Sequence, residues 1–179
     1  DLAVKSKPQA EQELATLKAF ARSELGLQDL QPYDVAYVSE KLKNATLSLS
    51  QETLRPYFPV SSVLSGLFNI TQTLVVIRIH EKHGVSTWHK EVRFFELLDA
   101  SGQLVGQFYL DLFARENKRG GAWMDSAVSR WKHPNGQLQT PVAYLVCNFS
   151  PPVGNTPACL THDEVTTLFH EFGHGIHHL

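Results

Sequence analysis

Cysteine is scarce in this 179-residue sequence, which contains only Cys147 and Cys159. Two cysteines are too few for a disulfide framework, so the sequence does not belong to the class of small disulfide-stapled secreted domains. We expect both residues to be free thiols, because nothing in their spacing indicates a redox pair. This usage indicates a reducing compartment, and we expect a cytoplasmic location.

An excess of charge of either sign is also missing. The sequence has 16 basic and 18 acidic residues, for a net charge of −2, and its basic residues do not cluster. We therefore expect neither nucleic acid nor an anionic membrane surface as a partner. The sequence also lacks an apolar run of roughly 20 residues, the length that spans a bilayer, and any signal-peptide pattern.

What the sequence does contain is ordinary globular composition, with 42% hydrophobic and 19% charged residues. Residues 1–75 read as four successive helices, which we expect to form scaffold. Pro8 suits the first position of one helix, and Gly26 is placed to end it. Pro32 opens the second helix, and Ser50 caps a short third one. A further apolar stripe at helical spacing follows before residue 75.

From Val75 the periodicity changes to that of strands, beginning with the run VVIRI. Two strands over 92–98 and 103–113, joined by a turn at 99–102, predict a β-hairpin. The segment 143–149 is apolar on both faces, which indicates either an inner strand or a strand that borders a cleft. The sequence therefore predicts an α+β fold, mainly helical, with a small and largely antiparallel sheet.

The last segment, Thr161 to Leu179, predicts an amphipathic helix. Its start is marked by Thr161-x-x-Glu164, the capping-box pattern. At about 100° per residue, one stripe of the helix is apolar and consists of Val165, Leu168, Phe169, Phe172, Ile176 and Leu179. The opposite side carries Asp163, His170, His174 and His177. One face is expected to be buried and the other to carry chemistry.

His170-Glu171-x-x-His174 lies on this second face and is a zinc-binding pattern. Residues four apart in a helix lie one turn above each other, so the two histidines can bind one ion with Glu171 as general base. A catalytic zinc needs a third protein ligand. His178 cannot supply it, because two turns separate it from His170 by about 12 Å. The alternative is an exposed histidine-rich helix face that binds no metal.

Two glycines, Gly173 and Gly175, stand inside this helix, where each costs on the order of 1 kcal/mol relative to alanine. We expect another backbone, from a packed helix or a bound peptide, to approach where a side chain would collide. A Gly173→Ala variant that kept both stability and activity would contradict this expectation.

Several segments resemble the thimet-type oligopeptidases, including FHEFGHGIHHL, STWHKEVRFFE, GQFYLDLFARENKRGGAWMDS and PVAYLVCNFSPPVG. The resemblance implies a zinc endopeptidase that cleaves short peptides in a channel between largely helical halves, with a small sheet beside the zinc. It implies that His170 and His174 are zinc ligands. Glu171 would take a proton from the attacking water and pass it to the leaving amine.

Gly120-Gly121-Ala122 resembles the segment that lines the substrate cleft in that family. Small residues there would let a peptide pair with this segment as an extra strand. The alternative interpretation is a simple tight turn, because glycine is a common turn residue.

The family's third zinc ligand, a glutamate, and its oxyanion-stabilising tyrosine and histidine would lie beyond Leu179. Because the sequence also starts without methionine, we expect a piece of a larger protein. Residues 1–179 would be part of one catalytic domain, with 1–75 as helical scaffold, 76–160 as hairpin and sheet, and 161–179 as active-site helix. The remainder of the parent chain would complete the site, and residues 1–179 alone would be inactive. The rival function is a non-catalytic zinc-binding or interaction module.

Overall fold

The computed structural model describes residues 1–47, 50–154 and 156–179. Residues 48 and 49, which fall in the range predicted to be helical, lie outside the described residues. The chain forms two compact units, Asp1–Thr53 and Leu54–Leu179, and each is described by itself. The boundary falls inside the range 1–75, and the assignment of both units to one catalytic domain stays a prediction.

The first unit begins with α1 (Leu2–Leu25), which Asp1 caps because its carboxylate accepts a hydrogen bond from the Ala3 N–H. The helix ends at Gly26 in the left-handed conformation, with φ 69°, as predicted. The prediction that Pro8 starts the helix is wrong, because Pro8 lies inside it. Proline removes one hydrogen bond to the carbonyl four residues earlier, and Val4 is 71% exposed there, so water can satisfy that carbonyl.

The second helix of this unit, α2 (Val35–Leu47), follows a 3₁₀ turn at Pro32–Asp34, so Pro32 opens the segment as predicted. A small cluster of Leu17, Ala21 and Val38 is buried between α1 and α2. The short helix α3 (Gln51–Leu54) has the predicted cap, since the Ser50 hydroxyl accepts a hydrogen bond from the Thr53 N–H at 3.1 Å.

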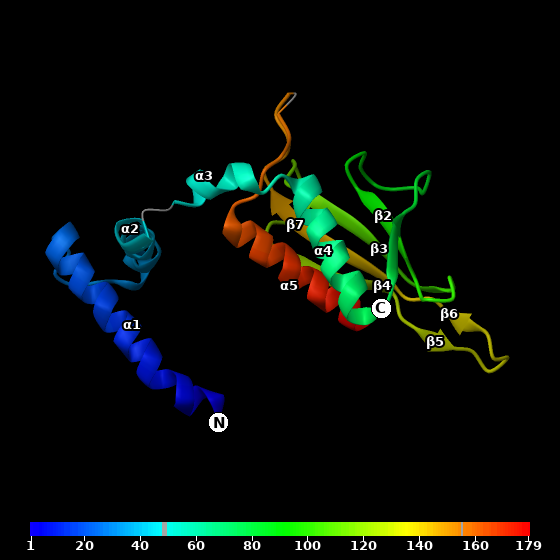
Figure 1. Ribbon diagram of the computed structural model, residues 1–179, viewed down its shortest axis with the longest axis horizontal. Coiled ribbons are helices and arrows are strands. Elements are labelled where there is room, and N and C mark those ends of the chain that lie inside the picture. Colours follow the sequence, from blue (N-terminus) through cyan, green and yellow to red (C-terminus); the bar gives the residue numbers. More distant parts are fainter. Residues whose placement is uncertain (48–49, 155) are drawn as a thin grey trace. The chain divides into compact units, whose positions relative to one another are not determined.

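The second unit contains α4 (Val60–Val75), a five-stranded sheet, a small two-stranded sheet and α5 (His162–His178). The large sheet has the order β1-β2-β3-β7-β4 (Figure 1), and its strands are Arg78–Glu81, Arg93–Leu98, Leu104–Phe113, Val142–Phe149 and Trp123–Val128 in that order. The small sheet pairs β5 (Trp131–Lys132) with β6 (Leu138–Gln139). Helices and a mixed sheet thus form an α+β unit, as predicted.

The predicted hairpin and inner strand are both confirmed. β2 and β3 are antiparallel, and the Asp99 carboxylate stabilises their turn by accepting hydrogen bonds from the backbone of Ser101 and Gln103. β7 lies between β3, to which it is parallel, and β4, to which it is antiparallel. The predicted strand start at Val75 is wrong, because α4 continues to Val75 and β1 begins at Arg78. Val75 has a local preference for β structure, but here it forms the last residue of α4 instead.

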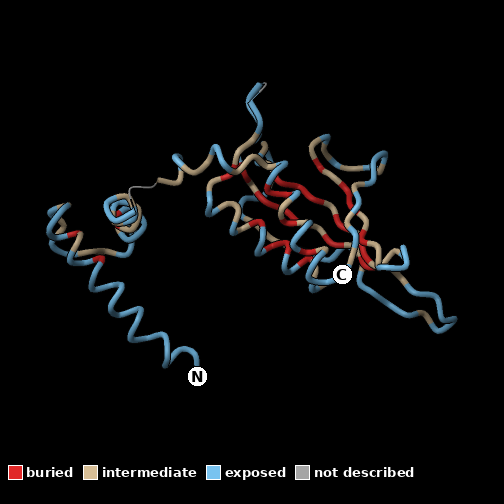
Figure 2. The backbone as a smooth tube through the Cα atoms, viewed as in Figure 1, coloured by how far each residue is buried: buried red, intermediate tan, exposed pale blue. Residues whose placement is uncertain are grey.

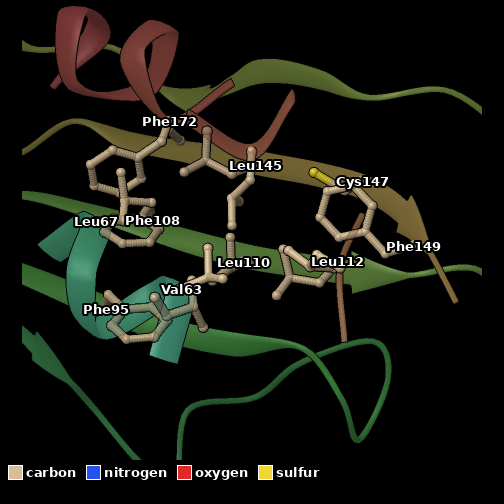
Figure 3. Packing of buried hydrophobic residues seen from close by; sticks show 14 of the residues in the cluster. Val63, Leu67, Phe95, Phe108, Leu110, Leu112, Leu145, Cys147, Phe149 and Phe172 are labelled. Carbon is tan, nitrogen blue, oxygen red and sulfur yellow. The ribbon is translucent and has the colours of Figure 1, made fainter. Parts of the chain in front are cut away.

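Helices α4 and α5 cover one face of the sheet and form the core with it (Figures 1 and 2). Phe68 of α4 lies 5.8 Å from Phe172 of α5 and 5.2 Å from Phe95 of β2, measured between ring centroids. Figure 3 shows the helix and strand side chains that meet in this layer, among them Val63, Leu67, Phe108, Leu110, Leu145 and Phe172. The core therefore fixes α5 against the centre of the sheet.

The opposite face of the sheet carries a buried ion cluster around Asp111. Its carboxylate accepts two hydrogen bonds from Arg115, at 2.7 and 2.8 Å, and one each from Lys118 and Trp88. Burial alone would raise the pKa of Asp111, but the hydrogen bonds from Arg115, Lys118 and Trp88 outweigh burial and lower the pKa to about 2. Trp88 and Trp123 also line a cavity of about 270 Å³ here.

Candidate metal and catalytic site

The capping box predicted at the start of α5 is present. The Thr161 hydroxyl accepts a hydrogen bond from the Glu164 N–H at 3.1 Å, and the Glu164 carboxylate accepts one from the Thr161 N–H at 2.8 Å. These two bonds satisfy backbone donors that would otherwise be free at the helix start. The cap therefore sets where the helix begins, and with it where each turn of the helix lies along the sheet.

The buried sector of α5 is rotated from the apolar stripe that the sequence predicts. Leu168, Phe172, Gly175 and Glu171 are buried, whereas Phe169 is 37% exposed, so its placement in the buried stripe was wrong. This difference follows from packing. α5 contacts β7, and Gly175 lies on the contacting side of the helix, where its lack of a side chain lets the helix approach the strand closely. As a result, the Glu171 side chain lies against the sheet.

The two helix glycines have different surroundings. A Cβ atom added to Gly175 would lie 2.8 Å from Cδ2 of Leu145 on β7, which is closer than side chains pack. The predicted close neighbour is therefore present at Gly175, although it is a strand side chain rather than a backbone. At Gly173 no packed element of the described residues lies within 4 Å of the added Cβ, so a packed helix is not the neighbour there, and the approach of a bound peptide stays a prediction.

His170 and His174 are exposed, and their side chains converge as the pattern predicts. Their Nε2 atoms are 3.0 Å apart, and their ring centroids are separated by 4.6 Å. Two nitrogens bound tetrahedrally to one zinc at 2.0–2.1 Å would be about 3.3 Å apart. A small rotation of either ring gives this separation, so the pair fits two adjacent corners of a zinc site.

A third ligand is missing from the part of the chain that the structure describes. No group of three histidine, cysteine, aspartate or glutamate side chains there is arranged to hold a metal. Cys147 on β7 is buried, and burial, with a smaller effect of the nearby Glu171 charge, raises the pKa of its thiol to about 12. Cys147 thus stays a thiol at neutral pH, and both cysteines are free, as predicted.

The segment Gly120-Gly121-Ala122 lies directly before the edge strand β4. Gly121 has φ 86°, a conformation that favours glycine. The Asn148 side chain on β7 donates hydrogen bonds to the carbonyls of Arg119 and Gly121 at 2.8 and 2.6 Å, so it fixes the shape of this segment. Sequence reasoning missed Asn148, because a single asparagine in a strand gives no signal of what it binds.

β4 also contacts α5, the helix that carries the two histidines. His178, near the end of α5, places its Nε2 atom 3.1 Å from the Ser126 hydroxyl and 3.3 Å from the Val128 carbonyl oxygen. The sequence excluded His178 as a ligand but gave no other role for it. The structure therefore brings together the histidine helix, the edge strand and the glycine segment in one unit.

Among the described helices, none is long and apolar enough to cross a bilayer. The model of peptidase family M3 matches residues 1–179. Oligopeptidase A of Escherichia coli (strain K12) is 56% identical over 179 residues, which cover 100% of this chain and 26% of the relative.

Two plant relatives from Arabidopsis thaliana also match, and each aligns over 95% of this chain. The first is an organellar oligopeptidase A, chloroplastic/mitochondrial, which is 39% identical over 177 residues and is covered to 22%. The second is a probable cytosolic oligopeptidase A, which is 38% identical over 177 residues and is covered to 25%. The chain thus spans about a quarter of the length of these relatives.

These matches confirm the predicted resemblance to the oligopeptidases, and within them to bacterial oligopeptidase A. The identity extends over the whole chain rather than over the histidine helix alone. The chain belongs to peptidase family M3.

Proposed function

We propose that the intact protein is a zinc metallopeptidase that hydrolyses peptide bonds in short peptides. The observation that carries this proposal is the 3.0 Å separation of the Nε2 atoms of His170 and His174, on a helix whose next face holds Glu171 against the sheet. Family membership and the names of the relatives support a peptidase. The same proposal includes a zincin-like fold for the catalytic domain, with the small sheet beside the helix that carries His170, Glu171 and His174.

In this site His170 and His174 would hold the metal. Zinc, when bound, supplies a Lewis acid that lowers the pKa of a coordinated water and polarises a carbonyl group. Glu171 accepts the proton of the attacking water and delivers it to the leaving amine. Glu171 is only 8% exposed, whereas the two histidines face solvent.

Peptide binding is assigned to the edge of the sheet. β4 is hydrogen-bonded to β7 on one side, and its other side is the end of the five-stranded sheet. A peptide can add there as a further strand, with the Gly120-Gly121-Ala122 segment offering backbone groups without bulky side chains. β4 also contacts α5, which supports the proposal that such a peptide would lie near Glu171.

The third zinc ligand and the oxyanion-stabilising groups are proposed to come from parts of the protein outside residues 1–179. The described residues would supply two ligands and a base, and they hold no group of three metal-binding side chains, whereas a catalytic zinc takes three protein ligands. Residues 1–179 alone would then bind zinc weakly or not at all and would not turn over peptide. A cytoplasmic location stays a prediction, since the relatives include both organellar and probable cytosolic proteins.

A Glu171→Gln variant of the intact protein tests this function. We expect kcat on a quenched fluorescent peptide to fall about 10²- to 10⁴-fold, the usual contribution of a general base, with bound zinc unchanged. Glu116→Gln, an exposed carboxylate far from α5 in sequence, is the matched control and should retain activity. A Glu171→Gln variant with full activity would favour the non-catalytic zinc-binding or interaction module.

The isolated 1–179 chain provides the second test. We expect no hydrolysis of the same peptide with or without added zinc. Turnover that a chelator abolishes would show that these residues already hold a complete site, and would overturn the assignment of the third ligand to another part of the protein.

A further inference from the structure

We propose that His178 is a positioning residue that fixes the edge strand β4 against the helix carrying His170, Glu171 and His174. Through β4, it would set where a bound peptide lies relative to these groups. The inference rests on the proposed function, because it assumes that the peptide pairs with β4.

The first observation is the place of His178 on α5. His170, His174 and His178 are spaced four residues apart, so they follow one stripe of the helix. The first two side chains face each other, at 3.0 Å between their Nε2 atoms. His178 lies about 12 Å from His170 along the axis, too far to share its ion, and its ring contacts β4 instead.

The second observation is how the His178 ring binds the strand. Nε2 lies 3.3 Å from the Val128 carbonyl oxygen and 3.1 Å from the Ser126 hydroxyl. A carbonyl oxygen can only accept, so a hydrogen bond to Val128 requires a proton on Nε2 of His178. The Ser126 hydroxyl, which can accept or donate, adjusts to that protonation. One half-buried ring thus contacts two residues of β4.

The third observation is the irregular pairing at this point of β4. Ser126 pairs with Ala143 and Val128 with Val142, so Ala127 is an extra residue in β4. A bulge of this kind interrupts the ladder and bends the strand. β7 is the strand to which β4 is hydrogen-bonded, so the interrupted ladder leaves this end of β4 weakly held. His178 binds the strand on both sides of Ala127.

The two ends of β4 are therefore held differently. Asn148, from β7, binds the segment before the strand through the carbonyl of Gly121. His178, from α5, binds the other end through Ser126 and Val128. Asn148 fixes β4 within the sheet, whereas His178 fixes it relative to the helix that carries the proposed catalytic groups. Reaction requires the scissile carbonyl to lie within about 3–3.5 Å of the attacking atom, so small shifts of β4 matter.

The test compares His178→Ala and His178→Gln in the intact protein. For His178→Ala we expect KM to rise about fivefold, with kcat changed less than about twofold, because the lost hydrogen bond acts on peptide binding. Bound zinc, measured by elemental analysis, should equal that of the unmodified protein. Glutamine carries an N–H donor at similar reach, so His178→Gln should restore most of the affinity. His80→Ala, an exposed histidine on β1 at the opposite edge of the sheet, is the matched control and should leave KM unchanged.

Hydrogen exchange provides a readout that does not depend on turnover. We expect His178→Ala to speed amide exchange in residues 123–128 several-fold, and to leave the exchange of residues 162–172 of α5 unchanged. Unaltered exchange in β4, loss of zinc, or a glutamine variant as impaired as the alanine variant would each overturn the positioning role. If the unmodified protein hydrolyses no peptide, the proposed function fails, while the exchange data still decide whether His178 holds β4.

Discussion

Two polar clusters lie on either side of β7, and they differ in how completely their groups are partnered. On one side, the Asp111 carboxylate is bound by Arg115, Lys118 and Trp88. The Lys118 ammonium also donates to the carbonyls of Phe113 and Cys147, at 2.8 and 2.6 Å, and its side chain is 5% exposed. On the other side, His170 and His174 are exposed and contact mainly each other.

The number of hydrogen-bond partners distinguishes a cluster that stabilises the fold from one that is available for binding. Removing one member of a buried, hydrogen-bonded ion cluster lowers stability strongly, because its partners stay buried without a group to pair with. Exposed imidazoles that face each other contribute little to folding, but their nitrogens stay available for a ligand. We therefore expect the Asp111 cluster to govern stability and the histidine pair to govern function.

Breaking the Asp111 cluster should have the largest effect on stability. We expect Asp111→Ala to lower the free energy of unfolding of the 1–179 chain by about 3–5 kcal/mol, since the charge of the buried Lys118 is left without a carboxylate to balance it. Urea unfolding followed by tryptophan fluorescence measures this, because all three tryptophans lie in the unit Leu54–Leu179. Glu116→Ala, an exposed carboxylate in the same loop, should change the free energy by less than about 0.5 kcal/mol.

Acid provides a second readout of the same cluster. The pKa of Asp111 is lowered from 3.8 to about 2, so the folded state binds the proton more weakly than the unfolded chain does. The stability that this group contributes is therefore fully present above about pH 4 and is lost as the pH falls toward 2. An Asp111→Asn variant should lack this part of the acid sensitivity. Identical acid unfolding of the two proteins would contradict the proposed strength of the cluster.

The packing of α5 against β7 should show an intermediate effect. We expect Gly175→Ala to lower the free energy of unfolding by about 1–3 kcal/mol, because its Cβ meets the buried Leu145 side chain. Gly173→Ala is the matched control and should raise stability by up to about 1 kcal/mol, since helix propensity improves and nothing described lies near its Cβ. Both values come from the same urea experiment. Equal changes in the free energy of unfolding for the two substitutions would show that α5 does not pack closely against β7 at Gly175.

Removing both exposed histidines should have the smallest effect on stability. For His170→Ala with His174→Ala, in the presence of a chelator, we expect the free energy of unfolding to change by less than about 0.5 kcal/mol. The same double variant of the intact protein should lose its bound zinc, measured by elemental analysis. A large loss of stability in the 1–179 chain in the presence of chelator would mean that the histidine pair stabilises the fold. The proposed difference between the two clusters would then be wrong.

Local signals in the sequence predicted the elements whose physical cause is local. Thr161 and Glu164 predicted the start of α5, and the turn at 99–102 predicted the hairpin, because both depend on hydrogen bonds between near neighbours. The Gly26 cap and the spacing of His170 and His174 were predicted for the same reason. These parts of the fold and of the site needed no knowledge of long-range contacts.

The remaining features depend on partners that are distant in sequence. Phe169 was misplaced because the seating of α5 is set by Leu145 of β7 rather than by the helix's own stripe. The β4 strand has a mostly exposed pattern without clear alternation, so its position at the sheet edge is visible only through its pairing with β7. Likewise, nothing in the sequence shows that His178 meets Ser126 and Val128.

The parallel pairing of β3 and β7 sets an order for folding. β7 is the last strand in the sequence but lies in the middle of the sheet, and β4 pairs with it rather than with an earlier strand. During synthesis, β1, β2 and β3 can join as soon as they emerge, whereas β4 has no strand to join until residue 149 has been made. The edge strand β4 of the proposed site can therefore pair with the sheet only after β7 has been synthesised.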